Sequence, residues 1–307
     1  MIKITDLPKD YNLSLNKMRH GLNYYLTDEI QSQLLPPHQI AMKTLSLLTL
    51  TAATALGCEN PFGYSYIAET IKPGKYEIEQ YITGRFGKDL GAGYDPRYRG
   101  FDLRTEIEYG ISATEQIALE FDQTYFDTAD REGLRFRGVS LEYKKMLADP
   151  DKSAWGRAFY LEAGYSQASL HDGHLRDRWT LESKYILQHN FGDNSPWMYV
   201  ANLGAEVLHT KGGEDAFELF VTQGISYQLS KEWTLGLEAV AASEWVEGAD
   251  FEESGVQIGP VINYRKDHLS VAFTVLAQLT GAPANKGRLN VSEYSPYEAR
   301  LAVAWEF

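Results

Sequence analysis

The chain has 307 residues, a formal net charge of −13 and a single cysteine. One cysteine excludes an intramolecular disulfide framework and a cysteine-rich metal site, and the acidic balance argues against a nucleic-acid partner. Mean hydropathy is −0.35 and no apolar run reaches about 18 residues, which excludes a helical membrane protein. A membrane β-barrel remains possible, because barrel strands alternate in polarity and their hydropathy averages out as polar.

The first recognisable element is a secretory signal peptide at residues 42–58, MKTLSLLTLTAATALGC. It has one lysine, a short apolar stretch and then small residues. Cleavage can fall before Cys58 or before Glu59, so Cys58 is either removed or retained, and acylation of Cys58 is an alternative. Against acylation, Ala55 stands where a lipoprotein signal usually has leucine.

Residues 1–41 precede this signal, and we interpret them as the product of a start codon placed too early. The alternative is a genuine cytosolic extension. After the signal, residues 59–74 form an N-terminal segment with several aromatic side chains that need burial. This segment can enter a barrel lumen as a plug or lie at the periplasmic mouth. The barrel itself is expected over residues 75–307.

From Pro73-Gly74 onward, apolar and polar residues alternate with period two, which is typical of strands with two different faces. Residues 101–109, FDLRTEIEY, are the clearest example. Several segments exceed ten residues, as membrane-spanning strands require, and their number is even. The sequence predicts an all-β protein, a twelve-stranded antiparallel transmembrane β-barrel with up-and-down meander topology. The twelve predicted strands lie near 75–87, 101–111, 116–127, 133–147, 154–167, 178–190, 196–209, 215–229, 232–246, 254–265, 268–280 and 296–307.

The connections between these segments alternate between short and long along the chain. Outer-membrane barrels have short periplasmic turns and longer external loops. With twelve strands, both chain ends are then expected in the periplasm. The longest external loops are predicted at 88–100 and 281–295, and these are the candidate surfaces for binding a partner.

Tryptophans are predicted to mark the two membrane interfaces as aromatic girdles. One rim, beside the short turns, is expected to hold Trp155, Trp197, Trp233 and Trp305, and the other Trp179 and Trp245. Trp305 and the terminal Phe307 also end a run of alternating apolar residues. This ending resembles the C-terminal signal that the barrel assembly machinery of the outer membrane reads.

Three stretches carry a resemblance to a known family: ENPFGYSY at 59–66, KYEIEQ at 75–80 and FDLRTEIEYG at 101–110. They resemble the opening of a family of uncharacterised Gram-negative outer-membrane β-barrel proteins, and the resemblance covers residues 59–307. It implies the barrel fold and a location in the bacterial outer membrane, after export across the inner membrane. It implies no substrate, catalytic residue or cofactor.

The face opposite the apolar one should line the lumen, and it is rich in carboxylates. A mid-depth acidic belt would favour cations in an open passage, whereas a closed polar core would pair the acids with basic residues across strands. The sequence does not decide between the open passage and the closed core. The predicted lumen-lining acidic residues are Asp102, Glu106, Glu108, Glu120, Asp122, Glu142, Glu162, Glu182, Glu206 and Glu238, with Glu218 and Glu298 in the same phase.

We predict a passive diffusion channel for small solutes, with cations favoured if the carboxylates line an open path. The alternatives are a closed barrel with a structural or surface-binding role, and a lipid-modifying barrel enzyme. An enzyme would need a nucleophile and a base within reach, and neither His268-Leu269-Ser270 nor His209 is placed for that role. The loop at 171–174, HDGH, could bind a metal but is more typical of a solvated loop. We therefore predict no enzyme, no cofactor and no metal site, with membrane lipid, the assembly machinery and small solutes as partners.

Overall fold

The computed structural model describes residues 60–89, 99–127, 132–168, 175–191, 195–247 and 250–307. These residues contain no helix that is long and apolar enough to cross a membrane. They form twelve strands whose alternation of exposed and buried residues follows the polarity pattern of the sequence. The strands are β1 (Tyr76–Phe86), β2 (Arg99–Ser112), β3 (Glu115–Asp127), β4 (Glu132–Ala148), β5 (Gly156–Ala168), β6 (Leu175–Asn190), β7 (Trp197–Thr210), β8 (Ala216–Gln228), β9 (Trp233–Val246), β10 (Asp250–Lys266), β11 (Leu269–Ala282) and β12 (Tyr297–Glu306).

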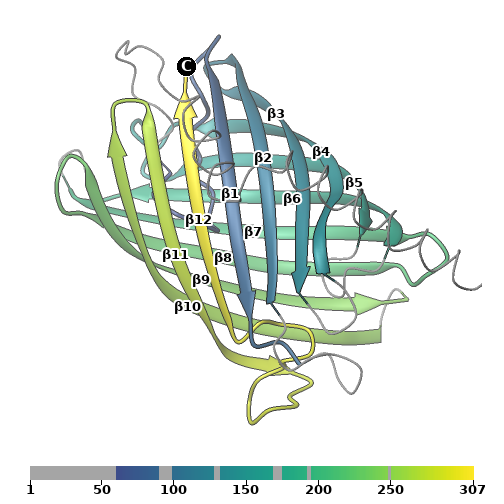
Figure 1. Ribbon diagram of the computed structural model, residues 1–307. Helices are drawn as coiled ribbons and strands as arrows, with labels where there is room; N and C mark the ends of the chain where they lie inside the picture. The colour runs from purple at the N-terminus through teal and green to yellow at the C-terminus, as the bar shows by residue number, and fades with distance from the viewer. Residues whose placement is uncertain (1–59, 90–98, 128–131, 169–174, 192–194, 248–249) are drawn as a thin grey trace, which may run out of the picture. The chain divides into compact units, whose positions relative to one another are not determined.

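Each strand pairs antiparallel with the next, and β1 also pairs with β12, so the sheet is a closed barrel (Figure 1). At the seam, Ile82 lies opposite Leu103 of β2 on one side and Leu301 of β12 on the other. Closure leaves no sheet edge with unpaired N–H and C=O groups, which would each cost several kcal/mol in hydrocarbon. The predicted fold class, a twelve-stranded up-and-down β-barrel, is therefore confirmed. The periplasmic location of the termini stays a prediction.

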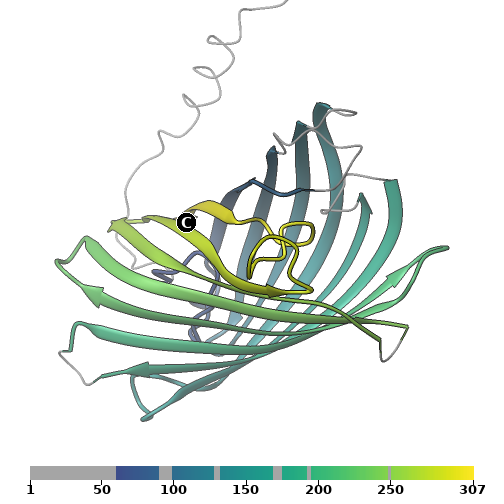
Figure 2. The ribbon, with the colours of Figure 1, turned by 90° about the horizontal axis from the view of Figure 1, so that it is seen from below.

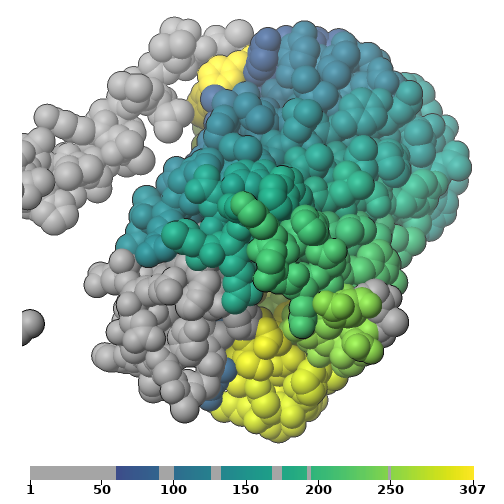
Figure 3. Space-filling view, turned by 90° about the vertical axis from the view of Figure 1, so that its right-hand side faces the viewer, coloured from purple at the N-terminus to yellow at the C-terminus, as the bar shows by residue number. Residues whose placement is uncertain are grey.

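The outer surface of the barrel is apolar. Large aliphatic side chains in the middle of the strands are exposed, for example Leu203 at 51% on β7 and Leu181 at 52% on β6. The side chains of neighbouring strands form a continuous outer surface in the space-filling view (Figure 3). In water, so much exposed apolar surface would be unstable, whereas in a bilayer it faces lipid.

Aromatic side chains gather at both ends of the strands. At the short-turn end, Trp155, Trp197 and Trp233 are exposed, and their rings lie 4.9, 4.8 and 4.8 Å from those of His189, Tyr227 and Tyr264. Trp305 lies at this end beside His268. At the long-loop end, Trp179 contacts Tyr165 and His209, and Trp245 contacts Phe217 and Phe251. The six tryptophans thus lie at the two rims, and their role as interfacial anchors stays a prediction.

Candidate functional site in the barrel interior

The N-terminal segment, which we define as residues 60–74, lies inside the barrel. Its most extensive contact is with Glu238 on β9, a fully buried carboxylate. The backbone N–H groups of Gly63, Tyr64 and Ser65 donate to the Glu238 oxygens at 2.9, 2.9 and 3.0 Å. The hydroxyl of Thr274 on β11 donates to the same carboxylate at 2.7 Å. Four donors therefore surround one buried anion, which explains how its charge is tolerated away from water.

Three amide side chains hold the rest of the segment, each from a different strand. Asn202 on β7 accepts from the Tyr66 N–H at 2.7 Å and donates to the Tyr66 carbonyl at 2.9 Å. The side-chain oxygen of Gln188 on β6 accepts from the Ala68 N–H at 2.8 Å, and that of Gln116 on β3 accepts from the Ile71 N–H at 3.0 Å. These side chains replace the ladder that a neighbouring strand would provide, so an irregular segment has its polar backbone satisfied.

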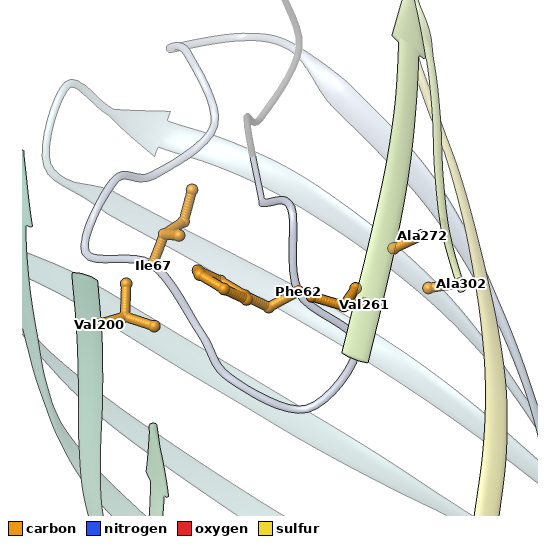
Figure 4. Packing of buried hydrophobic residues seen from close by; sticks show 6 residues of the cluster. All are labelled: Phe62, Ile67, Val200, Val261, Ala272 and Ala302. Atoms are coloured by element: carbon orange, nitrogen blue, oxygen red, sulfur yellow. The ribbon is translucent and has the colours of Figure 1, made fainter. Parts of the chain in front are cut away.

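Apolar contacts complete the seat of the N-terminal segment. Phe62 and Ile67 point between strands and pack with inward-facing Val200, Val261, Ala272 and Ala302 (Figure 4). A second cluster joins Ala68 to Ala158, Tyr160 and Ile186, with Tyr66 packed against it. The Tyr66 and Tyr160 ring centroids lie 5.2 Å apart. The barrel interior is thus polar on one part of its wall and apolar where the segment rests.

Sequence reasoning found Glu238 as a lumen-facing acid but missed its partners. The amide anchors Gln116, Gln188 and Asn202 were not predicted, nor was the apolar seat. One signal was present: Ile186 lies between Lys184 and Gln188 in the lumen phase of β6, and Val200 precedes Asn202 in the lumen phase of β7. Apolar residues in that phase indicate that something apolar lies inside the barrel.

Carboxylates on the inner face form a continuous line that crosses neighbouring strands. Glu162 lies directly opposite Glu142 on one side and Glu182 on the other, and the same pairing repeats from strand to strand. We call this line the carboxylate row. Its members, in spatial order, are Glu306, Glu77, Glu108, Glu142, Glu162, Glu182, Glu206, Glu218, Glu244 and Glu253, with Ala118 between Glu108 and Glu142.

The carboxylate row runs from one end of the barrel to the other. Glu306 is the last residue of β12 and Glu77 the second of β1, both at the short-turn end. Glu218 and Glu253 lie two and three residues inside the long-loop ends of β8 and β10. Residues that are paired from strand to strand form a line that rises along the barrel axis, because barrel strands tilt by about 35–45°. The acids therefore do not share one depth, which differs from the mid-depth belt considered from the sequence.

Basic side chains compensate only part of this charge. Arg104 contacts Glu120 at 2.8 Å and Asp122 at 2.9 Å, and lies 3.9 Å from Glu162. Lys184 pairs with Glu182 and lies over the ring of Tyr160. Like charges directly opposite one another destabilise a sheet. A row of this length therefore points to a role other than stability.

Further ion pairs lie toward the long-loop end. Arg85 pairs with Asp102 at 2.6 Å, and Arg137 pairs with Asp122. Of the predicted lumen-lining acids, the structure thus places Asp102, Glu120 and Asp122 in ion pairs, and Glu106, Glu108, Glu142 and Glu162 in the buried part of the interior. Glu182 and Glu206 are partly exposed, and Glu238 holds the N-terminal segment.

Two cavities lie beside the N-terminal segment. One measures about 170 Å³ and is lined by Arg104, Arg137 and Arg300 among others, and the second measures about 20 Å³ and is lined by acidic residues and Lys144. Both cavities touch the same three side chains, Asn60, Tyr66 and Tyr81. The smaller cavity has room for about one water molecule. The interior along β1 and β2 is thus narrow but not filled.

The long-loop mouth is partly covered by the connection between β11 and β12, residues 283–296, which folds back onto the barrel (Figure 2). Gln257 donates to the Ser295 carbonyl and Gln278 to the Asn290 carbonyl, both at 3.1 Å. Burial raises the pKa of Tyr294 well above its usual range. Burial, reinforced by Arg85, lowers the pKa of nearby Lys88 to about 8.

At the opposite mouth, a vestibule of about 790 Å³ is lined by residues of the short turns, including Pro61, Asp151, Lys231 and Arg265. It is open and mixed in charge, and it gives access to the barrel interior from this side.

His209 and His268, weighed as catalytic candidates, lie at the rims of the barrel, as does His189. His209 pairs with Asp215 at 2.7 Å, His189 contacts the Ala154 carbonyl at 2.6 Å, and His268 lies beside Trp305. Among the described residues, none of these three histidines has a hydrogen bond to a serine. The HDGH loop, the signal peptide and Cys58, and residues 1–41 lie outside the described residues.

Comparisons with known proteins agree with this fold. Residues 54–307 match the model of a family of unknown function, DUF6662. The comparison with curated proteins gives no match. Among solved structures, the COG4313 outer membrane channel from Pseudomonas putida F1 is 10% identical with a TM-score of 0.50, covering 78% of this chain and 98% of its own. The NanC porin is 10% identical with a TM-score of 0.49, covering 74% and 98%.

The family match spans most of the chain, so this protein belongs to the DUF6662 family, which confirms the resemblance seen in the sequence. At 10% identity, the likeness to the Pseudomonas putida channel shows the fold. Together with the apolar exterior between two aromatic rims, this fold makes the chain an outer-membrane β-barrel.

Proposed function

We propose that this DUF6662 protein is a narrow outer-membrane channel for small solutes, with cations favoured over anions. The observation that carries the proposal is the carboxylate row, which joins the two ends of the barrel. Rings and lines of carboxylates lower the energy of cations in a pore and raise that of anions. The passage is passive, because no catalytic step is needed for solutes to follow the row.

The exposure of the row supports a direction of entry. Its long-loop half is partly exposed, including Glu182, Glu206 and Glu218. Its middle is buried at Glu142 and Glu162. Cations would therefore gather at the long-loop mouth and meet the narrow part deeper in the barrel, which limits passage to small species.

The cavities support the size limit. The smaller one is lined by Glu77, Glu79 and Glu108, and about 20 Å³ accommodates about one water molecule. A sugar or peptide does not fit such a space, so passage beside the segment would be limited to species about the size of a water molecule or a bare ion. Tyr66 and Tyr81 stand where the two cavities meet.

Planar-bilayer recording tests the proposal. Under a KCl gradient, the reversal potential of the mature protein is expected to have the sign of a cation-selective pore. Replacing Glu182, Glu206 and Glu218 together by glutamine should move it toward zero, because the water-exposed half of the row loses its charge. Glu115→Gln, which changes an exposed acid at a short turn, is the matched control and should leave it unchanged. An open pore whose selectivity ignores the triple substitution would contradict the proposal.

The second candidate is a closed barrel with a structural role. The observation in its favour is the N-terminal segment, which is bonded to side chains of β3, β6, β7 and β9. In that case, correctly folded protein inserted into a bilayer would give no open level at any voltage. If conductance arises only in protein whose N-terminal segment has been released, the N-terminal segment acts as a permanent plug of the native barrel.

A further inference from the structure

Five glutamates gather at one point of the barrel wall, where β1 to β4 adjoin. Glu106 on β2 lies directly opposite Glu79 on β1 and Glu120 on β3. Carboxylate oxygens of Glu79, Glu106 and Glu108 lie within 4.8 Å of one another, and so do those of Glu106, Glu120 and Glu142. Glu106 is thus common to both groups. We call these five residues the Glu106 cluster.

Four members of the Glu106 cluster have partners that are not carboxylates. The Tyr81 hydroxyl donates to Glu79 at 2.6 Å, and Arg104 pairs with Glu120 at 2.8 Å. The Gln116 amide donates to Glu108 at 3.2 Å and to Glu142 at 3.5 Å. These contacts fix the positions of the four side chains around the fifth.

Glu106 itself is different. Its side chain is fully buried, and among the described residues neither of its oxygens accepts a hydrogen bond from a backbone N–H, an amide, a hydroxyl or a basic group; its neighbours are the carboxyl groups of the cluster. A buried carboxylate without a partner is costly, and its nearest neighbours are other carboxylates, which makes the cost larger. A positive species at this point would remove the cost. Arg104, the basic residue on the same strand, is directed to Glu120 and Asp122 rather than to Glu106.

The donor set indicates which cation would fit. Every ligand atom is a carboxylate oxygen, and such sites suit hard divalent cations rather than zinc or copper. Calcium binds oxygens at about 2.3–2.6 Å, so two of its ligands on opposite sides are about 5 Å apart. Magnesium needs shorter distances and a stricter geometry. Calcium, which accepts several carboxylates in a flexible geometry, therefore suits this crowded set of glutamates better than magnesium does.

The Glu106 cluster also adjoins a cavity. Glu79 and Glu108 line the small cavity of about 20 Å³, together with Glu77 and Lys144. We propose that Glu106, with the carboxylates around it, forms a calcium-binding site inside the barrel. The site does not depend on the proposed channel, since it would bind its ion in an open or a closed barrel.

Calorimetric titration with Ca²⁺ tests the site on the mature protein in detergent, after treatment with a chelator and in an excess of K⁺. Wild-type protein is expected to bind about one ion with saturation. Glu106→Gln should weaken binding at least tenfold, because the ligand common to both groups loses its charge. Glu115→Gln, which neutralises an acid at a short turn outside the cluster and the carboxylate row, is the matched control and should bind as the wild type does.

Folding of each variant is checked by its heat-modifiable migration in electrophoresis. If Glu106→Gln does not fold, Glu142→Gln serves in its place, with the same expected loss. Absence of saturable binding by the wild type, or equal binding by the wild type and a folded cluster variant, would overturn the calcium site. Because conductance is measured separately, failure of the site and failure of the channel are distinguishable.

Discussion

At the scale of single residues, the interior contains charges whose environment departs strongly from water. Lys88 follows β1 at the long-loop mouth, and its side chain is buried. Burial disfavours the ammonium form, and Arg85 nearby adds repulsion, so the pKa of Lys88 falls from 10.5 to about 8. In the unfolded chain this penalty is absent.

This shift predicts a pH dependence of stability. Between about pH 8 and 10.5 the folded barrel has released the Lys88 proton, while the unfolded chain still holds it. The unfolded state binds more protons there, so the contribution of Lys88 to the free energy of unfolding rises with pH across this window. Lys88→Met should remove this rise, measured by urea unfolding followed through tryptophan fluorescence.

Lys152→Met is the control for that measurement, because Lys152 is exposed at a short turn. It should keep the wild-type dependence on pH. If the free energy of unfolding rises equally in Lys88→Met and in the wild type between about pH 8 and 10.5, burial of the Lys88 ammonium is not the cause of the pH dependence.

At the scale of elements, the N-terminal segment differs from the strands in how it is held. A strand bonds to its neighbours through its whole backbone, whereas the segment relies on a few side chains from distant strands. Glu238 is the most heavily used of these, with three N–H donors from residues 63–65. Hydrogen bonds to a charged acceptor contribute about 1.5–3 kcal/mol each, so this one carboxylate dominates the attachment.

Glu238→Ala should therefore release the N-terminal segment. With Ser65→Cys as a probe in a Cys58→Ser background, labelling by a maleimide is expected to be slow, because Ser65 is only 1% exposed. In the added presence of Glu238→Ala, labelling should become at least tenfold faster, because residues 63–65 lose their common acceptor. Glu206→Ala changes a partly exposed carboxylate of the same barrel that is not among the segment's hydrogen-bonding anchors, and should leave the rate slow. Equal rates with and without Glu238 would contradict the anchoring role.

The strands could be predicted from the sequence because each one is specified locally. Alternation along FDLRTEIEY fixes which residues of β2 face lipid, whatever the other strands do. The seat of the segment could not be predicted in this way. Its anchors come from far along the chain, with Gln188 separated from Ala68 by 120 residues and Glu238 from Gly63 by 175. Only the closed barrel brings them together.

The carboxylate row has the same origin. The sequence showed an acid in the lumen phase of each strand from β4 to β8, but the direct opposition of Glu162, Glu182 and Glu206 depends on the register between strands. Register follows from turn geometry and barrel closure, which a single strand does not contain. Glu253 was also missed, because the predicted strand begins at residue 254 whereas β10 begins at Asp250.

At the scale of the whole molecule, closure of the barrel and occupation of its interior decide what can pass. The wall has no unpaired edge, so any solute must travel inside. The N-terminal segment takes much of that space, and the remaining cavities meet at Tyr66 and Tyr81. Tyr66 is held against Tyr160. Tyr81 belongs to β1 and packs against the apolar seat of the segment, but its hydroxyl donates to Glu79 rather than to the segment.

Tyr81→Ala should therefore widen the passage. Removing the ring joins the cavities of about 170 and 20 Å³, and we expect the single-channel conductance in planar bilayers to rise several-fold. Tyr76→Ala makes the same change on the same strand, but at a side chain that is 51% exposed on the outer rim, and should not alter conductance. An unchanged conductance in folded Tyr81→Ala would mean that solutes do not pass between these tyrosines, and the path would then have to follow the other side of the segment.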